Sequence, residues 1–242
     1  MDLMAIQALS VAGRLQDINL QLHGGEMLGV IGPNGAGKST LLNAIAGLLD
    51  KSGRIELEGQ ALEQYPALER ARRIALQPQF LDSAWALSVH DIVSMGRLPW
   101  GDSNQDIIRQ AMLETNVLRL STRPVNQLSG GERARVWLAR VLANQARVLL
   151  VDEPVANLDI HYQRDVMQIL QDYARQGHAV MIALHDLSLA ARYCDRLCLL
   201  QQGQLVKCDQ VDQVLTAELL RQVFQVDVFI DLAARPPVVL PH

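Results

Sequence analysis

Glycines followed by a lysine and a serine predict a loop that binds phosphate. Residues 32–40 read GPNGAGKST and match the pattern G-x-x-x-x-G-K-[ST], with an apolar run before them and a helical pattern after them. Glycine lets successive backbone N–H groups face one anion, which then rests at a helix N-terminus. Lys38 would reach the β- and γ-phosphates of a nucleotide, and the Ser39 hydroxyl would bind Mg²⁺. The predicted phosphate-binding residues are Gly32, Pro33, Asn34, Gly35, Ala36, Gly37, Lys38, Ser39 and Thr40.

Two adjacent carboxylates follow an apolar run at residues 148–151. Open α/β sheets bind ligands at the carboxyl ends of their strands, so we expect Asp152 and Glu153 at the same sheet edge as the phosphate loop. Asp152 would hold Mg²⁺, directly or through water. Glu153 would take a proton from an attacking water as a general base. A solvated strand end without a chemical role is the alternative.

Polar side chains at two further strand ends could complete this catalytic site. His185 follows the apolar run at residues 179–184, where an imidazole could hydrogen-bond a γ-phosphate and keep the attacking water in line. A structural histidine is the alternative. Gln79 lies just after a predicted strand that Pro78 ends, and its amide could contact Mg²⁺ or the water. Gln77 is a competing candidate two residues earlier.

A second glycine-rich turn lies at residues 128–132, which read LSGGE. Ser129 and Glu132 form the capping-box pattern that starts a helix, whereas glycines at its first positions weaken a helix. Gly130 and Gly131 carry no Cβ, so a phosphate could approach their N–H groups closely. One chain with one phosphate loop does not need two such turns, but a site shared between two copies does. A capping box with incidental glycines is the alternative.

The elements that would position these residues alternate between strands and helices, which predicts parallel strand pairing and an α/β fold. Residues 81–125 are helical instead, with one helix predicted over 104–120. We therefore expect a single domain whose core is formed by residues 1–80 and 126–242 and interrupted by a helical insertion at 81–125. The Pro-rich end at residues 233–242 gives little structural signal.

Composition limits the classes of partner. The 242 residues are 49% hydrophobic and 20% charged, as in ordinary globular proteins, and the net charge of −4 argues against nucleic acid as a partner. Three cysteines, Cys194, Cys198 and Cys208, are interpreted as buried free thiols of a reducing compartment. The first residues lack a basic signal-peptide region, and no apolar run approaches the ~20 residues of a membrane span. Another subunit would have to supply any membrane part.

Together, the ordered motifs resemble those of ABC transporter nucleotide-binding subunits over nearly the full chain. The motifs are GPNGAGKST, Gln79, LSGGE, VLLVDEP, NLD at residues 157–159, and LHD around His185. The resemblance implies an α/β fold: a P-loop NTPase core of the ABC ATPase type, with an antiparallel β subdomain and an inserted helical subdomain. It implies an ATPase that binds ATP with Mg²⁺, with Ser39, Gln79 and Asp152 at the metal.

The same resemblance implies a head-to-tail dimer of two copies of this chain. Each ATP would lie between the phosphate loop of one copy and the LSGGE turn of the other. Asp159 would belong to a loop that crosses the interface, and Gln79 would link the site to a membrane partner. The residues implied to contact ATP in trans are Ser129, Gly130, Gly131, Glu132 and Asp159.

A finer resemblance is to the branch that imports iron–siderophore chelates, haem and cobalamin, through LSVHDIVSMGRLPW, NLDIHYQ and LHDLSLAARYCDRLCLL. It implies ATP-driven dimerisation that powers uptake through two membrane permease subunits, with a substrate-binding protein beyond them. The chain would lie on the cytoplasmic face of the inner membrane. Trp85 and Trp100 are candidate permease contacts, with core packing as the alternative for each.

Two other functions compete with transport. A soluble ABC ATPase of DNA repair or translation is the first, but such proteins tend to carry long coiled-coil insertions or two cassettes, and this chain has one phosphate loop and no long heptad run. A phosphate-loop kinase is the second, and Glu153 together with the LSGGE turn argues against it. Members of the family commonly place an aromatic ring before the phosphate loop to stack on adenine. Residues 9–20 contain none, so we expect phosphate contacts to carry the affinity.

Overall fold

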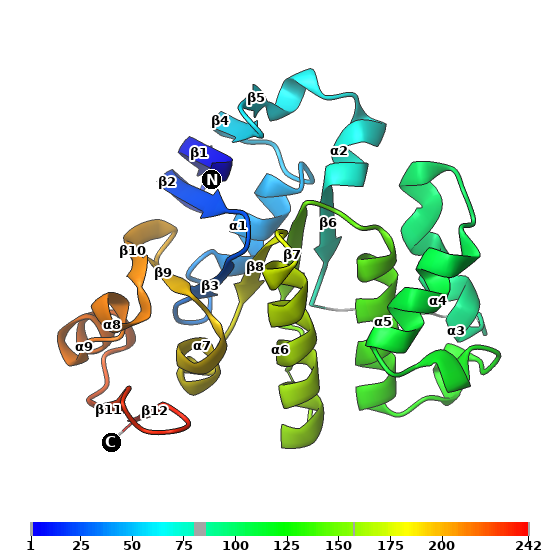
Figure 1. Ribbon diagram of the computed structural model, residues 1–242. Coiled ribbons are helices and arrows are strands. Elements are labelled where there is room, and N and C mark those ends of the chain that lie inside the picture. Colours follow the sequence, from blue (N-terminus) through cyan, green and yellow to red (C-terminus); the bar gives the residue numbers. More distant parts are fainter. Residues whose placement is uncertain (1, 80–85, 157, 242) are drawn as a thin grey trace.

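A mostly parallel sheet forms the centre of the protein in the computed structural model, which describes residues 2–79, 86–156 and 158–241 (Figure 1). Its strand order is β10-β9-β3-β8-β7-β6, and all neighbours pair in parallel except β9 and β10. The order places β3, β7 and β8, the strands that lead to the predicted site residues, side by side. The strands are β3 (Met27–Ile31), β6 (Ile74–Gln77), β7 (Val148–Asp152), β8 (Ala179–Ala183), β9 (Arg196–Gln201) and β10 (Gln204–Gln210).

The central strands are buried on both faces because their apolar residues alternate between two cores. In β7, Val148 and Leu150 join one core, whereas Leu149 and Val151 join the other. Side chains of a strand alternate between faces with a period of two, so a continuous apolar run can fill both cores. This is why an unbroken VLLV run predicted a buried parallel strand, and the prediction is confirmed.

An antiparallel sheet covers one face of the central sheet, with α1 (Lys38–Ile45) packed between the two (Figure 1). Leu41 and Leu42 of α1 are fully buried in the core that the two sheets share. The expected antiparallel β subdomain is therefore present. Its order is β2-β1-β4-β5, from β1 (Asp2–Val11), β2 (Leu15–His23), β4 (Ser52–Leu57) and β5 (Gln60–Ala61).

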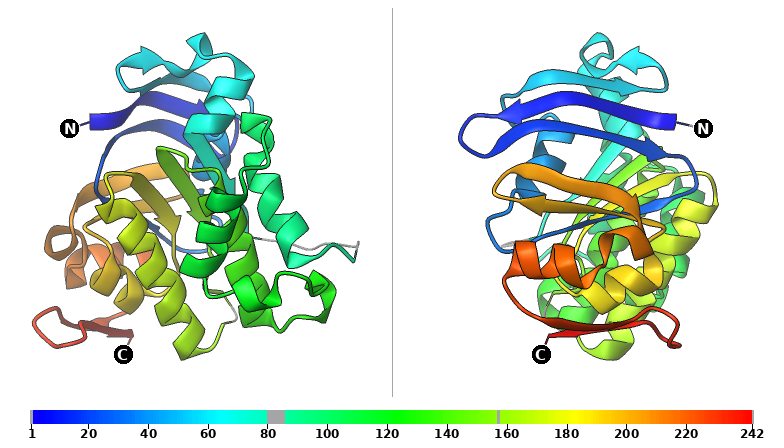
Figure 2. Two further views of the ribbon diagram at one scale, coloured as in Figure 1. Left: turned by 45° about the vertical axis from the view of Figure 1, so that its right-hand side comes forward. Right: turned by 90° about the vertical axis from the view of Figure 1, so that its left-hand side faces the viewer.

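Helices cover the opposite face of the central sheet. The long ones are α5 (Gly130–Ala143) and α6 (Ile160–Arg175), and α7 (Leu187–Tyr193) lies beside α6 (Figures 1 and 2). The short α2 (Ala67–Arg73) leads into β6. The N-termini of α1 and α7 follow β3 and β8 closely, so their first turns lie at the carboxyl edge of the sheet.

A helical lobe packs against α5. It contains α3 (Val89–Ser94), the 3-10 segment η2 (Met95–Trp100) and α4 (Gln105–Glu114), and it corresponds to the expected insertion, whose first five residues lie outside the described part of the chain. The helix predicted over 104–120 was too long. Asn116 adopts a left-handed φ of 54°, which ends α4, and a 3-10 turn (Leu118–Leu120) follows.

Trp100 fixes the lobe to the core. Its indole N–H donates to the backbone oxygen of Asn144 at 2.8 Å, and the guanidinium groups of Arg72 and Arg97 lie 5.2 and 4.9 Å from its ring centroid. Arg97 is itself buried and pairs with Asp102 at 2.7 Å. Trp100 is nevertheless 37% exposed, so it is not a buried core residue, and its contact with a permease stays a prediction. Trp85, the other candidate permease contact, lies outside the described residues.

The C-terminal end is more ordered than its sequence indicated. After α8 (Val211–Val214) and α9 (Ala217–Phe224), the strands β11 (Val228–Asp231) and β12 (Val238–Pro241) form a hairpin (Figure 2). The hydroxyl of Ser188 in α7 donates to the oxygen of Val239 and accepts from its N–H, both at 3.1 Å. The sequence of this end predicted little structure because prolines are uncommon in strands, and two of them directly precede the short strand β12.

The cysteines differ from the expectation of three free thiols. Cys198 and Cys208 face each other across the antiparallel pair β9–β10 and form a disulfide, whereas Cys194 is free and buried. Directly opposed residues of an antiparallel pair bring their Cα atoms close enough for a disulfide. The interpretation was wrong for these two residues because the sequence alone did not give their register.

Candidate active site

The phosphate loop connects β3 to α1 and has the backbone that its glycines predicted. Gly32, Gly35 and Gly37 have φ values of 151°, 77° and 106°, a region that favours glycine. Gly37 is the N-cap residue of α1, so the loop ends at a helix N-terminus. A Cβ on Gly32 would lie 3.1 Å from that of Ala36, which leaves no room for a side chain. The loop is thus built to present N–H groups to an anion.

Lys38 lies beneath this loop and is nearly inaccessible, with 5% of its surface exposed. Its Nζ donates to the backbone oxygens of Gly32 at 2.9 Å and Pro33 at 3.3 Å. Burial lowers the pKa of Lys38, and the charges of Glu153 and Asp152 act against that shift. A buried cation held by carbonyl oxygens alone has much to gain from a phosphate, which would offer charged oxygens in their place.

A cavity of about 750 Å³ opens over the phosphate loop and brings the predicted catalytic residues together. Gln79 from the end of β6, Glu153 from the end of β7 and His185 from the end of β8 all line it. Gly13, Arg14 and Ala156 also line it and were not predicted. The rest of the lining is the phosphate loop itself: Asn34, Gly35, Ala36, Gly37, Lys38, Ser39 and Thr40.

Glu153 is held from both sides in this cavity. Nε2 of Gln79 donates to Oε2 of Glu153 at 2.6 Å, and Nε2 of His185 pairs with Oε1. Glu153 also has a left-handed φ of 49°, a conformation that non-glycine residues adopt at a cost of about 1–3 kcal/mol and that clusters at active sites. Each carboxylate oxygen has a second lone pair, so Glu153 can still accept a proton from water while both contacts hold.

Gln79, rather than Gln77, reaches the site. Gln77 is the last residue of β6, is 4% exposed, and its Oε1 has no hydrogen-bond partner among the described residues. The alternation of strand side chains turns Gln77 into the interior, whereas Gln79 lies beyond the strand end. The sequence left these two open because the exact end of the strand decides between them.

Asp152 lies at the end of β7 and is 4% exposed. Its Oδ1 has no hydrogen-bond partner among the described residues. Burial raises the pKa of Asp152, the charge of Glu153 adds to the rise, and a hydrogen bond from Ser39 together with Lys38 and His185 opposes it. An unsatisfied buried carboxylate oxygen beside a serine hydroxyl is the kind of donor set that Mg²⁺ accepts, so the residues fit this metal.

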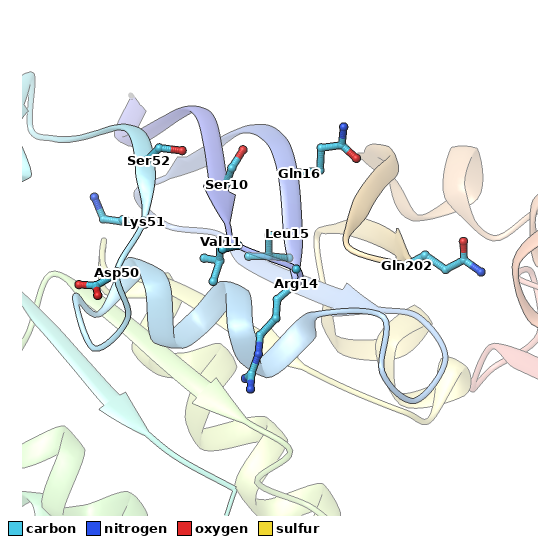
Figure 3. A pocket seen from close by; sticks show the side chains of 11 residues that line it. Ser10, Val11, Arg14, Leu15, Gln16, Asp50, Lys51, Ser52 and Gln202 are labelled. Carbon is cyan, nitrogen blue, oxygen red and sulfur yellow. The ribbon is translucent and has the colours of Figure 1, made fainter.

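A second hollow, of about 570 Å³, adjoins the phosphate cavity and shares Gly13 and Arg14 with it (Figure 3). Its remaining lining comes from the β1–β2 turn, from residues 50–52 and from Gln202, and none of these side chains is aromatic. Lys51 is engaged by Glu63 at 2.8 Å. Arg14, whose side chain extends away from the turn in Figure 3, is the planar cation of this lining.

The second glycine-rich turn forms the start of α5. Oγ of Ser129 accepts from the N–H of Glu132 at 3.3 Å, and Oε2 of Glu132 accepts from the N–H of Ser129 at 2.9 Å, so the predicted capping box is present. Hydrogen bonds from Ser129 lower the pKa of Glu132. Asp159 similarly caps α6. Asn157, of the NLD motif, lies outside the described residues.

Neither the LSGGE turn nor Asp159 reaches the phosphate cavity of its own chain. Of the described residues that line this cavity, none belongs to residues 128–132 and none is Asp159. One chain therefore brings together the phosphate loop, Gln79, Glu153 and His185, and leaves the residues that were implied to act in trans apart from them.

The fold and the site define a phosphate-loop ATPase whose nucleotide cavity lies at the carboxyl edge of a parallel sheet. The family model for ABC transporters matches residues 15–156. The chain belongs to the ABC transporter family, as an ATP-hydrolysing subunit. None of its described helices has the length and hydrophobicity to span a bilayer.

Similar proteins come from several bacteria. The hemin import ATP-binding protein HmuV of Pseudomonas entomophila is 44% identical over 225 residues, which cover 89% of this chain and 88% of that protein. HmuV of Streptomyces coelicolor is 40% identical over 236 residues, covering 94% and 84%. Among solved structures, an ABC transporter of the metal-chelate type in an inward-facing conformation matches with a TM-score of 0.86 and 28% identity, covering 100% of this chain and 98% of that one.

Asp152→Asn should stabilise the protein while it stops hydrolysis. Between the ordinary and the raised pKa of Asp152 the folded protein binds more protons than the unfolded chain, so its stability falls as pH rises through that window. Without nucleotide and metal, the free energy of unfolding of the variant, measured in urea at neutral pH, should exceed that of the wild type by about 1 kcal/mol. This difference should shrink as the pH is lowered. Its Mg²⁺-dependent ATP hydrolysis should fall by roughly a hundredfold or more.

Asp172→Asn is the matched control, because Asp172 is 54% exposed and pairs at the surface with Arg175. It should change neither the stability nor the turnover appreciably. A variant Asp152→Asn that is less stable than the wild type at neutral pH would mean that the charge of Asp152 does not destabilise the fold.

Proposed function

We propose that this chain is the motor of an importer for haem or another metal chelate, and that two copies close on ATP to drive it. The observation that carries the proposal is the division of the site. A complete phosphate loop with a carboxylate base lies in one cavity, and a second glycine-rich helix start lies outside it. The similarity to hemin import proteins and to a transporter of the metal-chelate type supports the substrate class.

Hydrolysis would begin with a triphosphate on the N–H groups of the phosphate loop. Lys38 would exchange the carbonyl oxygens of Gly32 and Pro33 for β- and γ-phosphate oxygens and offset their charge. Glu153 would accept a proton from the attacking water at a free lone pair of its carboxylate, and its contact with His185 would open when the γ-phosphate attracts the imidazole. His185 would then be free to hydrogen-bond the γ-phosphate.

Ser39 and Asp152 would hold Mg²⁺ at this site, with Gln79 as a further candidate. The orphaned Oδ1 of Asp152 and its neighbouring serine hydroxyl support this assignment. Bound there, the ion would neutralise charge that develops on the phosphate oxygens.

Closure of two copies would complete the site. Ser129, Gly130 and Asp159 lie at helix starts whose positive ends favour an anion, and a second chain would bring such an anion to them. Ile160, directly after Asp159, is 85% exposed, as expected of an apolar residue that a partner surface covers. ATP would shift the equilibrium toward the closed dimer because it binds both surfaces only there.

The nucleoside would occupy the hollow beside the phosphate loop. Arg14 lines both spaces, so a nucleotide with its phosphates on the loop would lay its base against this side chain. A guanidinium can stack on an aromatic base and would replace the aromatic ring that residues 9–20 lack. This role would add a contact with the base to the phosphate contacts on which the affinity was expected to rest.

The partners follow from the proposed motor. Two membrane permease subunits would bind the two cassettes and respond to their closure, and a substrate-binding protein would deliver the chelate from the other side. The chain would work at the cytoplasmic face of the inner membrane, attached through the permease.

Glu153→Gln should trap the closed dimer. The amide keeps the shape of the side chain but cannot accept a proton, so ATP should bind and remain. Light scattering should report a dimer with ATP and Mg²⁺, and turnover should fall by roughly a thousandfold. Ser129→Arg in the same background is the control, since its bulk should block the approach of the second copy. A Glu153→Gln protein that stays monomeric with ATP bound would overturn the proposed dimer.

Arg14→Ala should weaken ATP binding by roughly tenfold, a loss typical of one cation–π contact. Tripolyphosphate, which has no base, should bind the variant as it binds the wild type. Arg14→Tyr should retain the ATP affinity, because an aromatic ring can stack on the base. Arg14→Lys should lose most of the contribution of Arg14 to that affinity, because lysine keeps the charge but has no planar group to stack on the base. Calorimetry measures all of these affinities, with Lys38→Ala as the control that loses both ligands. An equal loss of ATP and tripolyphosphate in Arg14→Ala would mean that Arg14 contacts phosphate instead of the base.

The substrate class can be tested with the permease that co-purifies with the tagged chain from solubilised membranes. In liposomes, haem presented with its binding protein should raise ATP hydrolysis several-fold above the basal rate. Ferric siderophore and cobalamin serve as the comparison ligands of the same branch. Stimulation by none of the three would contradict the proposed importer, and stimulation by one of the other two would replace haem as its substrate.

A further inference from the structure

The two glycines of the LSGGE turn have different surroundings. A Cβ on Gly130 would meet nothing within 4 Å, so this glycine is open to an approaching ligand. A Cβ on Gly131 would lie 2.6 Å from Cε2 and 2.7 Å from Cγ of Tyr162. An aromatic ring of the same chain therefore occupies the space that a side chain at residue 131 would need. The contact of the Gly131 N–H group with phosphate stays a prediction.

Arg135, one turn further along α5, holds the other part of this ring. Its guanidinium carbon lies 4.5 Å from the ring centroid of Tyr162. Arg135 is 4% exposed, and its Nε has no hydrogen-bond partner among the described residues. A buried cation needs compensation, and the face of an aromatic ring supplies part of it. The ring is thus fixed to α5 at two points, Gly131 and Arg135.

Tyr162 itself belongs to the first turn of α6. Its backbone N–H donates to Oδ1 of Asp159, the N-cap residue of that helix, at 3.1 Å. The side chain of Tyr162 therefore joins the start of α5 to the start of α6, although the two helix starts are about thirty residues apart in the sequence.

We infer that Tyr162 is a positioning residue that holds the LSGGE turn and Asp159 as one surface for the second copy. The inference rests on the proposed function, because both helix starts act there on the ATP of the partner. With the ring in place, one approach of the partner engages both helix starts. Without it, each start must be ordered separately when the dimer closes, which weakens closure.

The contact depends on the ring and not on the hydroxyl. The atoms that meet Gly131 and Arg135 belong to the ring, so Tyr162→Phe keeps the contact and Tyr162→Ala removes it. Arg164→Ala is a matched control, because Arg164 lies on the same helix, its side chain is 60% exposed, and its contact is with the neighbouring Asp165.

The first experiment measures ATP-induced dimerisation in the Glu153→Gln background by light scattering over a range of protein concentrations. Adding Tyr162→Ala should raise the dimer dissociation constant by about tenfold, whereas Tyr162→Phe and Arg164→Ala should leave it unchanged. ATP binding to the monomer should be unaffected in all three, because Tyr162 does not line the phosphate cavity. Equal dimerisation with and without the ring would overturn the inference. A parent Glu153→Gln protein that forms no dimer would instead overturn the proposed function on which the inference rests.

The second experiment tests the contact within one chain and needs no dimer. Gly131→Ala should lower the free energy of unfolding in urea, because the new Cβ meets the ring of Tyr162. The double variant with Tyr162→Ala should lose less of this free energy than the sum of the losses of the two single variants. Gly130→Ala, whose Cβ meets open space, is the control for folding stability. Additive effects of the Gly131 and Tyr162 changes would show that the ring does not pack on this glycine, and the inference would fail.

Discussion

The phosphate loop keeps its shape because two neighbouring turns pack directly against its glycines and its backbone. A Cβ on Gly37 would meet the side chain of Leu15 at 2.7 Å, and one on Gly203 would lie 3.3 Å from the Cα of Leu15. The N–H of Gly203 also donates to the oxygen of Ala36 at 2.9 Å. The turn between β1 and β2 and the turn between β9 and β10 therefore hold the loop from outside. A larger residue at either glycine would push the loop away from the geometry that an anion requires.

Unlike charges are buried close together next to this loop. Lys38 and Asp152 are 5% and 4% exposed, burial shifts the pKa of each toward its neutral form, and each is opposed by the charge of the other. Burial of these two charges therefore costs free energy of folding, which their mutual attraction offsets in part. If both residues act as proposed, stability and activity compete at these positions, because a neutral side chain would stabilise the fold but would not bind phosphate or metal.

The sequence predicted those parts of the fold and site that local patterns determine. A strand, a glycine loop and a helix over residues 27–45 could be read directly, and the carboxyl ends of β7 and β8 placed Glu153 and His185 near the loop. It could not give contacts that depend on register or distance in the fold. The pairing of Cys198 with Cys208, the ring of Tyr162 on Gly131 and the place of Arg14 beside the loop are all of this kind. The sequence signal that could have indicated a role for Arg14 was its position as a cationic residue in the turn before β2.

The carboxylate of Glu153 is restrained from two sides. Its two oxygens are engaged by side chains from two different strands, Gln79 after β6 and His185 after β8. His185 is followed by α7, whose first turn the C-terminal hairpin binds through Ser188, and Gln79 precedes the helical lobe along the chain. The carboxylate of Glu153 is therefore connected through His185 to the element that binds the C-terminal hairpin, and through Gln79 to the segment that precedes the helical lobe. In the proposed mechanism, a triphosphate that draws either side chain to its γ-phosphate would remove one restraint on Glu153 while it supplies the bond to be broken, so nucleotide binding would also adjust the proposed base.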